Sequence, residues 1–354
     1  MENPTAARKG TKARSVTKDV ARLAGVSTAT VSRVLNNSLQ VDPETRQKVL
    51  DAAAKLRYVP HGPARSLRSH RSKMVGAIVP SFDYALYART TSALQQRLDE
   101  SGYALVVAEH HYDLAAETRI ASEMVGHGVD AFVLVGLDHQ QGLFAMLEDF
   151  DRPYVLSWGV DPAQRHPSIG FDNRAATFQV TRHLIALGHR RIGLLSAPVA
   201  DNDRARARGE GLRAALSEAG LELDSRHIAY APISLATAEA AMHKLLGVSP
   251  RPTAIVATND VFAVGAMMAC RQAGVNIPHE LSITGVDNTD LGATQTPGLT
   301  SVATPIREIG RAAGEQLVAR LEGRGWEAFQ TFPVEIVFRG STSRPAQPEE
   351  VSSP

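Results

Sequence analysis

A short stretch near the N-terminus, "STATVSR" at residues 27–33, carries side chains that could read the edges of DNA bases. Thr28, Ala29 and Thr30 are small enough to approach the major groove closely, and their methyl groups could contact those of thymine. Arg33 follows one helical turn later and could pair with O6 and N7 of guanine. If this stretch forms a helix, it predicts a base-reading surface.

The usual signatures of nucleotide enzymes and metal enzymes are absent from the sequence. It contains neither G-x-x-x-x-G-K-[ST] nor G-x-G-x-x-G, and its 12 histidines show no H-E-x-x-H spacing. The one cysteine, Cys270, lies in an apolar helical run, where we expect it to pack in a core. We therefore expect no catalytic residues, no metal site and no cofactor.

Two short helices and a glycine turn must position the base-reading surface. The pattern predicts a helix over 18–24, capped by Thr17 and ended by Gly25. A second helix is expected over 28–35, with Ser27 as its cap. This arrangement is typical of a helix-turn-helix, whose second helix lies in the major groove.

A third helix is expected from Asp42-Pro43 onward, which would complete a minimal three-helix domain. Each helix should turn an apolar face toward a shared core. The expected core residues are Val20, Leu23 and Ala24 in the first helix, Val31, Val34 and Leu35 in the second, and Val49, Leu50, Ala53 and Leu56 in the third.

From residue 74 onward, short β-branched runs alternate with amphipathic helical stretches. Such alternation predicts a parallel sheet with helices on both faces. The pattern occurs twice, so we expect two similar α/β lobes with a cleft between them. The expected strands cover 74–80, 103–110, 131–136 and 153–159 in the first lobe, and 191–198, 228–233, 254–260 and 281–288 in the second. Near the end, "FPVEIVFRGS" is interpreted as a last strand pair.

The charge of the chain is distributed unevenly. Residues 1–73 hold 15 lysines and arginines against 5 acidic residues, whereas the remainder holds 23 against 32. A basic front module on an acidic body indicates that the front module meets a polyanion. There is no apolar signal region and no run of 18 apolar residues, so neither secretion nor a membrane span is expected.

Three segments, "VTKDVARLAGVSTATVSRVLNN", "VDPETRQKVLDAAAKLRYVP" and "ARSL", resemble the LacI/GalR family of bacterial repressors, and the resemblance extends over residues 16–341. It implies an N-terminal helix-turn-helix DNA-binding domain followed by a two-lobed, periplasmic-binding-protein-like α/β core. It also implies a hinge helix at "ARSL", where Leu67 would wedge into the minor groove. The implied DNA-contacting residues are Thr17, Ser27, Thr28, Ala29, Thr30, Ser32, Arg33, Asn36, Arg65 and Leu67.

The same resemblance divides the chain into segments. A disordered basic tail (1–15) precedes the helix-turn-helix domain (16–60) and a hinge or linker (61–73), and the core covers 74–341. The first lobe would consist of about 74–172 and 304–331, and the second of 173–303 and 332–340. Residues 342–354 would form a disordered tail without leucine heptads, which favours a homodimer over a tetramer.

Polar residues at the strand ends are the candidate effector-binding groups, because open α/β sheets bind ligands there. By the resemblance they are Tyr84, Asp172, Asn202, Arg204, Arg208, Asn259, Asp260 and Asp287. An aspartate after a strand is often only a helix cap, and that alternative stays open for Asp172 and Asp260. The chain departs from the family at Tyr84, where most members have asparagine.

Arginines at 204, 206 and 208 favour an anionic effector such as a sugar acid, and "VAEHHYD" and "GFDN" are similar to stretches of gluconate-type regulators. The sequence thus predicts a bacterial, cytoplasmic, nucleoid-associated homodimer that binds a palindromic operator in double-stranded DNA. A small metabolite, a sugar or sugar acid, would control its operator affinity. The alternatives are a sugar-binding receptor and an α/β enzyme without a role on DNA.

Overall fold

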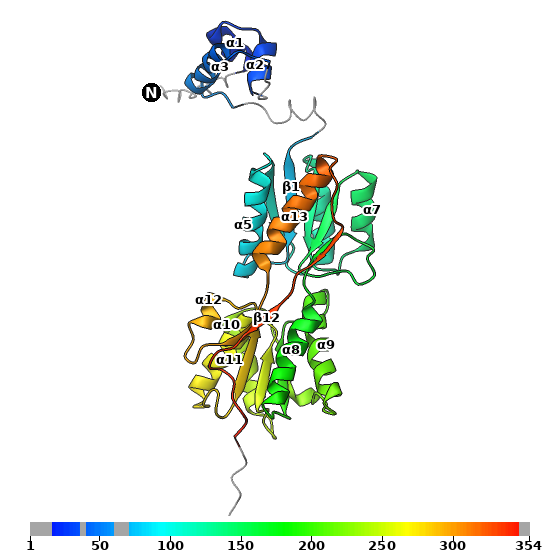
Figure 1. The fold of residues 1–354 in the computed structure, drawn as a ribbon, viewed down its shortest axis with the longest axis vertical. Coiled ribbons are helices and arrows are strands. Elements are labelled where there is room, and N and C mark those ends of the chain that lie inside the picture. The colour runs from blue at the N-terminus through cyan, green and yellow to red at the C-terminus, as the bar shows by residue number, and fades with distance from the viewer. Residues whose placement is uncertain (1–15, 36–39, 60–70, 347–354) are drawn as a thin grey trace, which may run out of the picture. The chain divides into compact units, whose positions relative to one another are not determined.

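The computed structural model describes residues 16–35, 40–59 and 71–346 of the 354-residue chain. It divides into two compact units, one that ends at Ser72 and one that begins at Lys73 (Figure 1). The expected basic tail at 1–15, most of the expected hinge, and Asn36, Arg65 and Leu67 lie outside the described residues.

The first unit contains three helices around a small apolar core. They are α1 (Thr17–Ala24), α2 (Thr28–Leu35) and α3 (Pro43–Lys55). Gly25 ends α1 in the left-handed conformation (φ 68°), as expected, because glycine has no Cβ to clash there. Asp42 caps α3 by accepting a hydrogen bond from the backbone N–H of Thr45 at 2.9 Å. Val20, Val31, Val34 and Val49 are fully buried between the helices.

Three local expectations for this unit were wrong. Val16, not Thr17, occupies the cap position of α1, and the Thr17 hydroxyl lies 2.7 Å from the hydroxyl of Tyr58. Leu23 and Leu50 are 46% and 43% exposed. Both leucines lie roughly a third of a turn from the centre of the buried face of their helix, and small alanines next to the valines occupy that face instead.

The second unit contains two six-stranded sheets, which define two lobes. The first lobe holds β1 (Met74–Val79), β2 (Ala104–Glu109), β3 (Ala131–Val135), β4 (Tyr154–Ser157), β5 (Ser168–Gly170) and β11 (Phe329–Thr331), in the spatial order β11-β5-β4-β3-β1-β2. The second holds β6 (Ile192–Ser196), β7 (Ile228–Tyr230), β8 (Ala254–Ala257), β9 (Ser282–Val286), β10 (Thr300–Ala303) and β12 (Glu335–Val337), in the order β12-β10-β9-β8-β6-β7. The two sheets thus follow the same spatial plan.

Helices cover both faces of each sheet (Figure 1). The first lobe carries α5 (Ala85–Asp99), α6 (Leu114–Gly126), α7 (Gln141–Asp149) and α13 (Ile306–Leu321); the second carries α8 (Asn173–Ala186), α9 (Asp203–Glu218), α10 (Leu235–Leu246), α11 (Asp260–Gln272) and α12 (Asp290–Ala293). In β1, Val75 and Ala77 belong to the same core cluster as α5 and α13, while Ile78 belongs to the cluster of α6 and α7. Successive side chains of a strand point to opposite faces, so a doubly covered strand must be apolar throughout. The parallel sheets predicted from these runs are confirmed.

The end of the chain returns to both lobes. The stretch "FPVEIVFRGS" does not form a strand pair, because only Glu335–Val337 is a strand, and it pairs antiparallel with β10. The preceding strand β11 pairs with β5 of the first lobe. The three-residue strand β5 was not expected, because three residues are too few to show a period. Three segments therefore cross between the lobes, after β5, β10 and β11.

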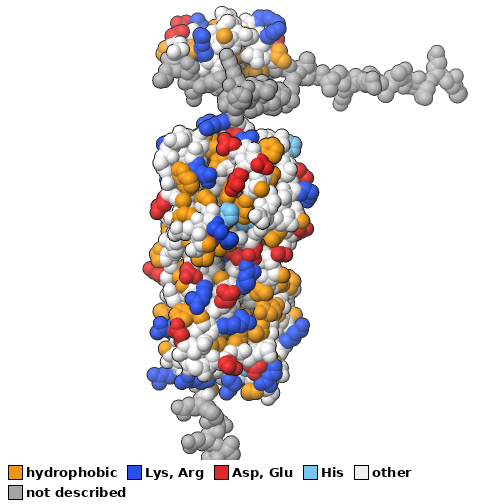
Figure 2. Space-filling model, turned by 90° about the vertical axis from the view of Figure 1, so that its right-hand side faces the viewer, with side chains coloured by type: hydrophobic (Ala, Val, Ile, Leu, Met, Phe, Trp, Pro, Cys, Tyr) orange, Lys and Arg blue, Asp and Glu red, His pale blue; other side chains and the backbone are white. Residues whose placement is uncertain are grey.

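The expected disordered tail does not begin at Thr342. The backbone N–H of Ser343 donates to Ser282 Oγ at 3.0 Å, and the Ser343 carbonyl lies 2.9 Å from His189 Nε2. These bonds attach the segment to the second lobe. Acidic and basic side chains are interspersed over the face of the second unit that Figure 2 shows. Among the described helices, none is long and apolar enough to cross a membrane.

Candidate functional sites

The exposed side of α2 presents the residues expected to read bases. Ser27 caps this helix, because its Oγ accepts the backbone N–H of Thr30 at 3.1 Å. Thr28, Ala29 and Arg33 are exposed, whereas Thr30 and Ser32 are half-buried. Arg33 forms no side-chain hydrogen bond or ion pair with the residues that the structure describes. The exposed side of α2 thus presents small side chains and the guanidinium of Arg33, which has no hydrogen-bond or ion-pair partner among the described residues.

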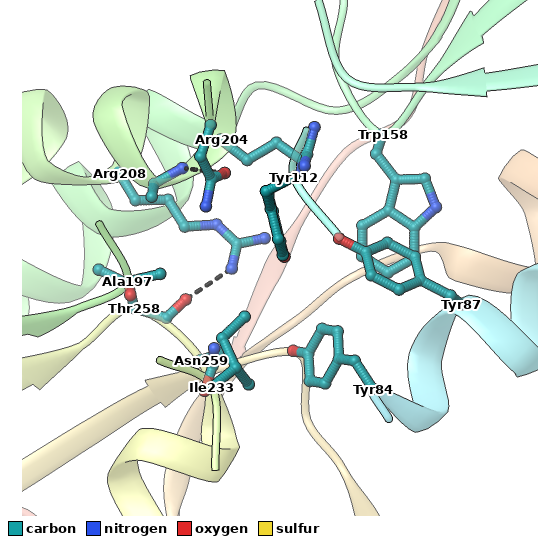
Figure 3. Close-up of a pocket in the computed structure, with 12 residues that line it drawn as sticks. Tyr84, Tyr87, Tyr112, Trp158, Ala197, Arg204, Arg208, Ile233, Thr258 and Asn259 are labelled. Atoms are coloured by element: carbon teal, nitrogen blue, oxygen red, sulfur yellow. Dashed lines mark hydrogen bonds between the residues drawn. The ribbon is translucent and has the colours of Figure 1, made fainter. Parts of the chain in front are cut away.

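A pocket lies between the two lobes (Figure 3). It is lined by Tyr84, Tyr87, Tyr112 and Trp158 of the first lobe, and by Ala197, Asn202, Arg204, Ala205, Arg208, Ile233, Thr258 and Asn259 of the second. Strand ends and helix starts supply nearly all of these residues, as expected for open α/β sheets. The space left between the side chains is about 30 Å³, enough for about one water molecule.

Arg208 is held rigidly on the second-lobe wall. Its Nε donates to Asn173 Oδ1 at 2.8 Å, and its Nη1 donates to the carbonyl oxygen of Thr258 at 2.5 Å. The guanidinium also lies over the Phe171 ring, 5.8 Å from its centroid. Its Nη2 lies 3.7 Å from Asp287 Oδ1, which is an ion-pair distance without a hydrogen bond.

Asp287 joins the two lobes at the edge of the pocket. The hydroxyl of Tyr84, 203 residues away in the sequence, donates a short hydrogen bond to Asp287 Oδ2. Asp287 directly follows β9 in the left-handed backbone region, with φ 107°. Burial raises the pKa of its carboxyl to about 7, and Arg208 only partly opposes this shift. Near neutral pH the carboxyl is therefore poised between its charged and protonated forms.

Aromatic rings form the first-lobe wall. The ring centroids of Tyr87 and Trp158 are 5.0 Å apart, and those of Tyr84 and Tyr87 are 5.5 Å apart. Trp158 is 1% exposed, and its indole Nε1 has no hydrogen-bond partner among the described residues. Its backbone is also left-handed, with φ 71°. A buried donor left unpaired is costly, so this N–H is a candidate ligand contact.

Two asparagines of the pocket also cap helices. Asn202 Oδ1 accepts the backbone N–H of Ala205 at 3.2 Å and begins α9. Asn259 Oδ1 accepts that of Phe262 at 2.9 Å and begins α11. Because the cap consumes the amide oxygen, each residue has its amide nitrogen left to offer a ligand.

Arg204 lies beside these caps and contacts both lobes. Its Nη1 donates to Asp203 Oδ1 at 2.8 Å and to the carbonyl of Val135, in the first lobe, at 3.3 Å. Arg206, expected to contribute to the same basic cluster, points elsewhere. Its Nη2 donates to both carboxylate oxygens of Asp138, at 2.7 and 2.9 Å, so only two of the three arginines line the pocket.

Three candidate effector residues are not among the residues that line the pocket: Asp287, which contacts the lining residues Tyr84 and Arg208, and also Asp260 and Asp172. Asp260 is 1% exposed and accepts hydrogen bonds from Thr289 and from Ser301 Oγ, which ties α11 to β10. Asp172 is exposed and caps α8 by accepting the N–H of Ala175 at 2.9 Å. It borders a separate groove beside α9. Asp172 thus serves as the helix cap that the sequence had left open as an alternative, whereas Asp260 is a buried structural acceptor and the cap of α11 is Asn259.

Comparison with known proteins places these features in a family. The family model described as "Bacterial regulatory proteins, lacI family" matches residues 16–61, and a "Periplasmic binding protein-like domain" matches residues 181–342. The HTH-type transcriptional regulator DegA of Bacillus subtilis is 32% identical over 331 residues, which cover 92% of this chain and 97% of that protein. The chain belongs to the LacI family.

Other LacI-family relatives are similar over nearly their whole length. Catabolite control protein A of Priestia megaterium is 30% identical, with 92% of this chain and 98% of the relative covered. The transcriptional repressor PurR of Photobacterium profundum is 31% identical, with 92% and 97% covered. These relatives are transcriptional regulators and not enzymes, which supports the function class expected from the sequence.

Solved structures of LacI-family regulators have the same fold. A regulator from Silicibacter pomeroyi superimposes with a TM-score of 0.85 at 29% identity and covers 93% of this chain and 99% of that one. The lac repressor dimer bound to operator and the anti-inducer ONPF gives 0.82 at 27% identity, with 93% and 99% covered. The complex of the regulator CelR with cellobiose gives 0.69 at 30% identity, with 93% and 100% covered.

Seven of the twelve lining residues of this LacI-family pocket were not predicted from the sequence, among them the aromatic residues Tyr87, Tyr112 and Trp158. Trp158 does carry a signal, because it lies near the C-terminal end of the strand expected over 153–159, and it directly follows β4 in the structure. Tyr87 lies inside α5 and resembles any core aromatic in sequence. Tyr112 lies in a loop whose left-handed backbone (φ 62°) no sequence pattern indicated.

Proposed function

We propose that this LacI-family regulator binds a palindromic operator in double-stranded DNA as a homodimer, and that a small metabolite bound between its lobes changes its operator affinity. The observation that carries the proposal is the capped helix α2, whose exposed side offers Thr28, Ala29 and Arg33. The protein would act in the bacterial cytoplasm, at the nucleoid, where its operator lies.

In the DNA complex, α2 would lie in the major groove, with Arg33 on a guanine and Ala29 against a thymine methyl group. Thr17, Ser27, Thr30, Ser32 and Asn36 would lie near phosphates. Arg65 and Leu67 would belong to a hinge helix in the minor groove, with Leu67 as an apolar wedge. Two copies would read the two half-sites of a palindrome, since protein and operator share the two-fold symmetry.

The tightness of the interlobe pocket supports control by a metabolite. About 30 Å³ of free space cannot hold a sugar, so a ligand must move the walls apart or displace Tyr112. Ligand binding is then coupled to the arrangement of the lobes. A ligand that prefers the arrangement incompatible with operator binding weakens that binding, and one with the opposite preference strengthens it. CelR with cellobiose is a similar protein with a bound metabolite.

Operator binding can be tested with purified full-length protein on a site selected from random double-stranded DNA. We expect a palindromic consensus and an affinity that falls steeply with salt, because each phosphate neutralised releases about 0.9 of a counterion. Arg33→Ala should weaken binding by about 1–3 kcal/mol and relax the preference at one position of each half-site.

The control for this experiment is Arg119→Ala, which removes the same charge from an exposed ion pair with Glu123 on α6. Affinity and base preference should remain those of the parent protein. Selection without a consensus, or an affinity independent of salt, would contradict the proposed function.

A further inference from the structure

Several oxygen atoms in and beside the pocket already accept hydrogen bonds from the protein. The amide oxygens of Asn202 and Asn259 are occupied by helix caps at 3.2 and 2.9 Å. The carbonyl of Thr258 accepts from Arg208. The Asp287 carboxylate accepts from Tyr84 and, at 3.4 Å, from Thr304 Oγ1. Each of these oxygen atoms is therefore already engaged by the protein before a ligand arrives.

Donors remain available on both walls. The amide nitrogens of Asn202 and Asn259 have no hydrogen-bond partner within the described parts of the chain. The indole of Trp158 lines the pocket from the other lobe, and its Nε1 is buried without a hydrogen-bond partner among the described residues. Nη2 of Arg208 makes an ion pair at 3.7 Å but no hydrogen bond. Such a site is complementary to a ligand rich in acceptors.

The charges in the pocket also favour a ligand that accepts hydrogen bonds, and in particular an anionic one. Arg204 is paired with Asp203 at 2.8 Å, so its charge is balanced. The second guanidinium, Arg208, faces only Asp287, whose carboxyl is partly protonated near neutral pH. A buried cation without a full counter-charge is unfavourable, and an anionic ligand supplies that charge.

Resting on the function proposed above, we propose that the interlobe pocket binds a carboxylate-bearing polyhydroxy acid of sugar size in preference to the neutral sugar. Nη2 of Arg208 binds the carboxylate, and the indole N–H of Trp158 and the amides of Asn202 and Asn259 donate to ligand oxygens. The aromatic rings of Tyr87 and Trp158 pack against the carbon skeleton. Because Asn173 and Thr258 already fix Arg208, the guanidinium needs little rearrangement to pair with one carboxylate.

The ligand class is tested by calorimetric titration and thermal shift of the full-length protein with matched compounds. The panel pairs aldonates and uronates with their aldoses, for instance gluconate and glucuronate with glucose, and adds glucose 6-phosphate and inorganic phosphate. We expect at least one acid to bind about tenfold or more tighter than its aldose, the change expected for one charge-assisted hydrogen bond. Failure of every acid to bind, or tighter binding of an aldose or a phosphate ester, overturns the proposal.

Two substitutions test the donors individually. Trp158→Phe keeps an aromatic wall but removes the N–H, and should weaken acid binding about tenfold. Its control is Trp326→Phe, in the chain's other tryptophan, which is 42% exposed outside the pocket and should have no effect.

Asn259→Asp keeps a capping oxygen for α11 but replaces the donor by a negative charge, so acid binding should be lost while the thermal stability is retained. Unchanged acid affinity in both pocket variants contradicts the assigned contacts.

Operator binding measured on the same samples separates this inference from the proposed function. If a neutral sugar binds more tightly and alters operator affinity, the ligand class is wrong and the regulatory function stands. If an acid binds with the expected preference but leaves operator affinity unchanged, the ligand class stands and metabolite control fails.

Discussion

At the scale of single residues, two buried aspartates of the second unit have opposite pKa shifts. Burial raises the pKa of Asp287 to about 7, despite the attraction of Arg208. Burial also acts to raise the pKa of Asp161, but hydrogen bonds from the backbone N–H groups of Ala163, Arg165 and His166 outweigh it and lower that pKa. Burial thus favours the neutral form of Asp287, whereas backbone donors favour the charged form of Asp161.

Replacing each aspartate by asparagine should therefore have opposite pH dependences. Asp287 has a higher pKa in the folded state than in the unfolded state. Its contribution to the free energy of unfolding is therefore fully present below the unfolded pKa, and this contribution is lost as the pH rises toward 7. Asp287→Asn should raise the free energy of unfolding relative to the parent protein at pH 8, by on the order of 1 kcal/mol or more, and less at pH 5. Asp161 contributes stability above its unfolded pKa, so Asp161→Asn should destabilise at pH 7 and progressively less as the pH falls toward 3.

Denaturant unfolding across pH 3–8 measures both effects. Parallel pH profiles for the two variants would show that the burial of Asp287 does not control its ionisation.

At the scale of elements, helix α9 carries Arg204 and Arg208 and must pack closely on α8 to position them. Gly211 makes that approach possible, because a Cβ there would lie 2.1 Å from the carbonyl oxygen of Arg174 and 2.4 Å from Thr177 Oγ1. Two residues earlier, a Cβ on Gly209 would meet the far end of the Arg213 side chain at 3.3 Å and Leu194 Cδ2 at an ordinary contact distance of 3.7 Å. The two glycines of one helix thus have different roles.

Gly211→Ala should destabilise the protein by about 1–3 kcal/mol, because the added methyl group must push α9 away from α8. The shift should also weaken ligand binding, since Arg208 moves with the helix. Gly209→Ala provides the control and should be neutral or stabilising by up to about 1 kcal/mol, the gain in helix propensity. Thermal unfolding of both variants measures the difference, and equal melting temperatures would contradict the packing argument.

At the scale of the whole second unit, the lobes contact each other around the N-terminus of α9. Gly136, in the first lobe, lies so close to Arg204 that a Cβ would be 1.9 Å from its Nη1 and 2.5 Å from Asp203 Oδ1. Arg206 with Asp138 and Arg89 with Asp290 form further ion pairs between the lobes, at 2.7 and 2.6 Å. These contacts set the separation of the lobes and hence the size of the pocket.

Gly136→Ala should hold the lobes further apart and change operator affinity severalfold without ligand, because it biases the arrangement that a metabolite controls. Gly136 has φ 98°, so backbone strain is a second effect of the substitution. Gly102→Ala isolates that strain, since Gly102 has φ 71° and open space around its Cβ position. We expect the control to lose about 1 kcal/mol of stability but to keep its operator affinity. A larger radius of gyration of Gly136→Ala in small-angle scattering would accompany the change, and identical scattering and affinity for both variants would refute it.

The sequence by itself determined the features that depend on short-range signals. Ser27, Gly25 and Asp42 mark helix ends within a few residues, so the helix-turn-helix and its exposed Arg33 could be predicted. Apolar runs of four to six residues predicted most of the parallel strands, strand ends indicated Asn259 and Asp287, and the family resemblance indicated Arg208. Only the tertiary structure decided what depends on contacts across the chain. It joined Tyr84 to Asp287, brought Trp158 to the pocket and bound Asp260 to Ser301 of β10. These outcomes depend on side chains up to about 200 residues apart, whose burial is set by which faces meet and not by the local sequence.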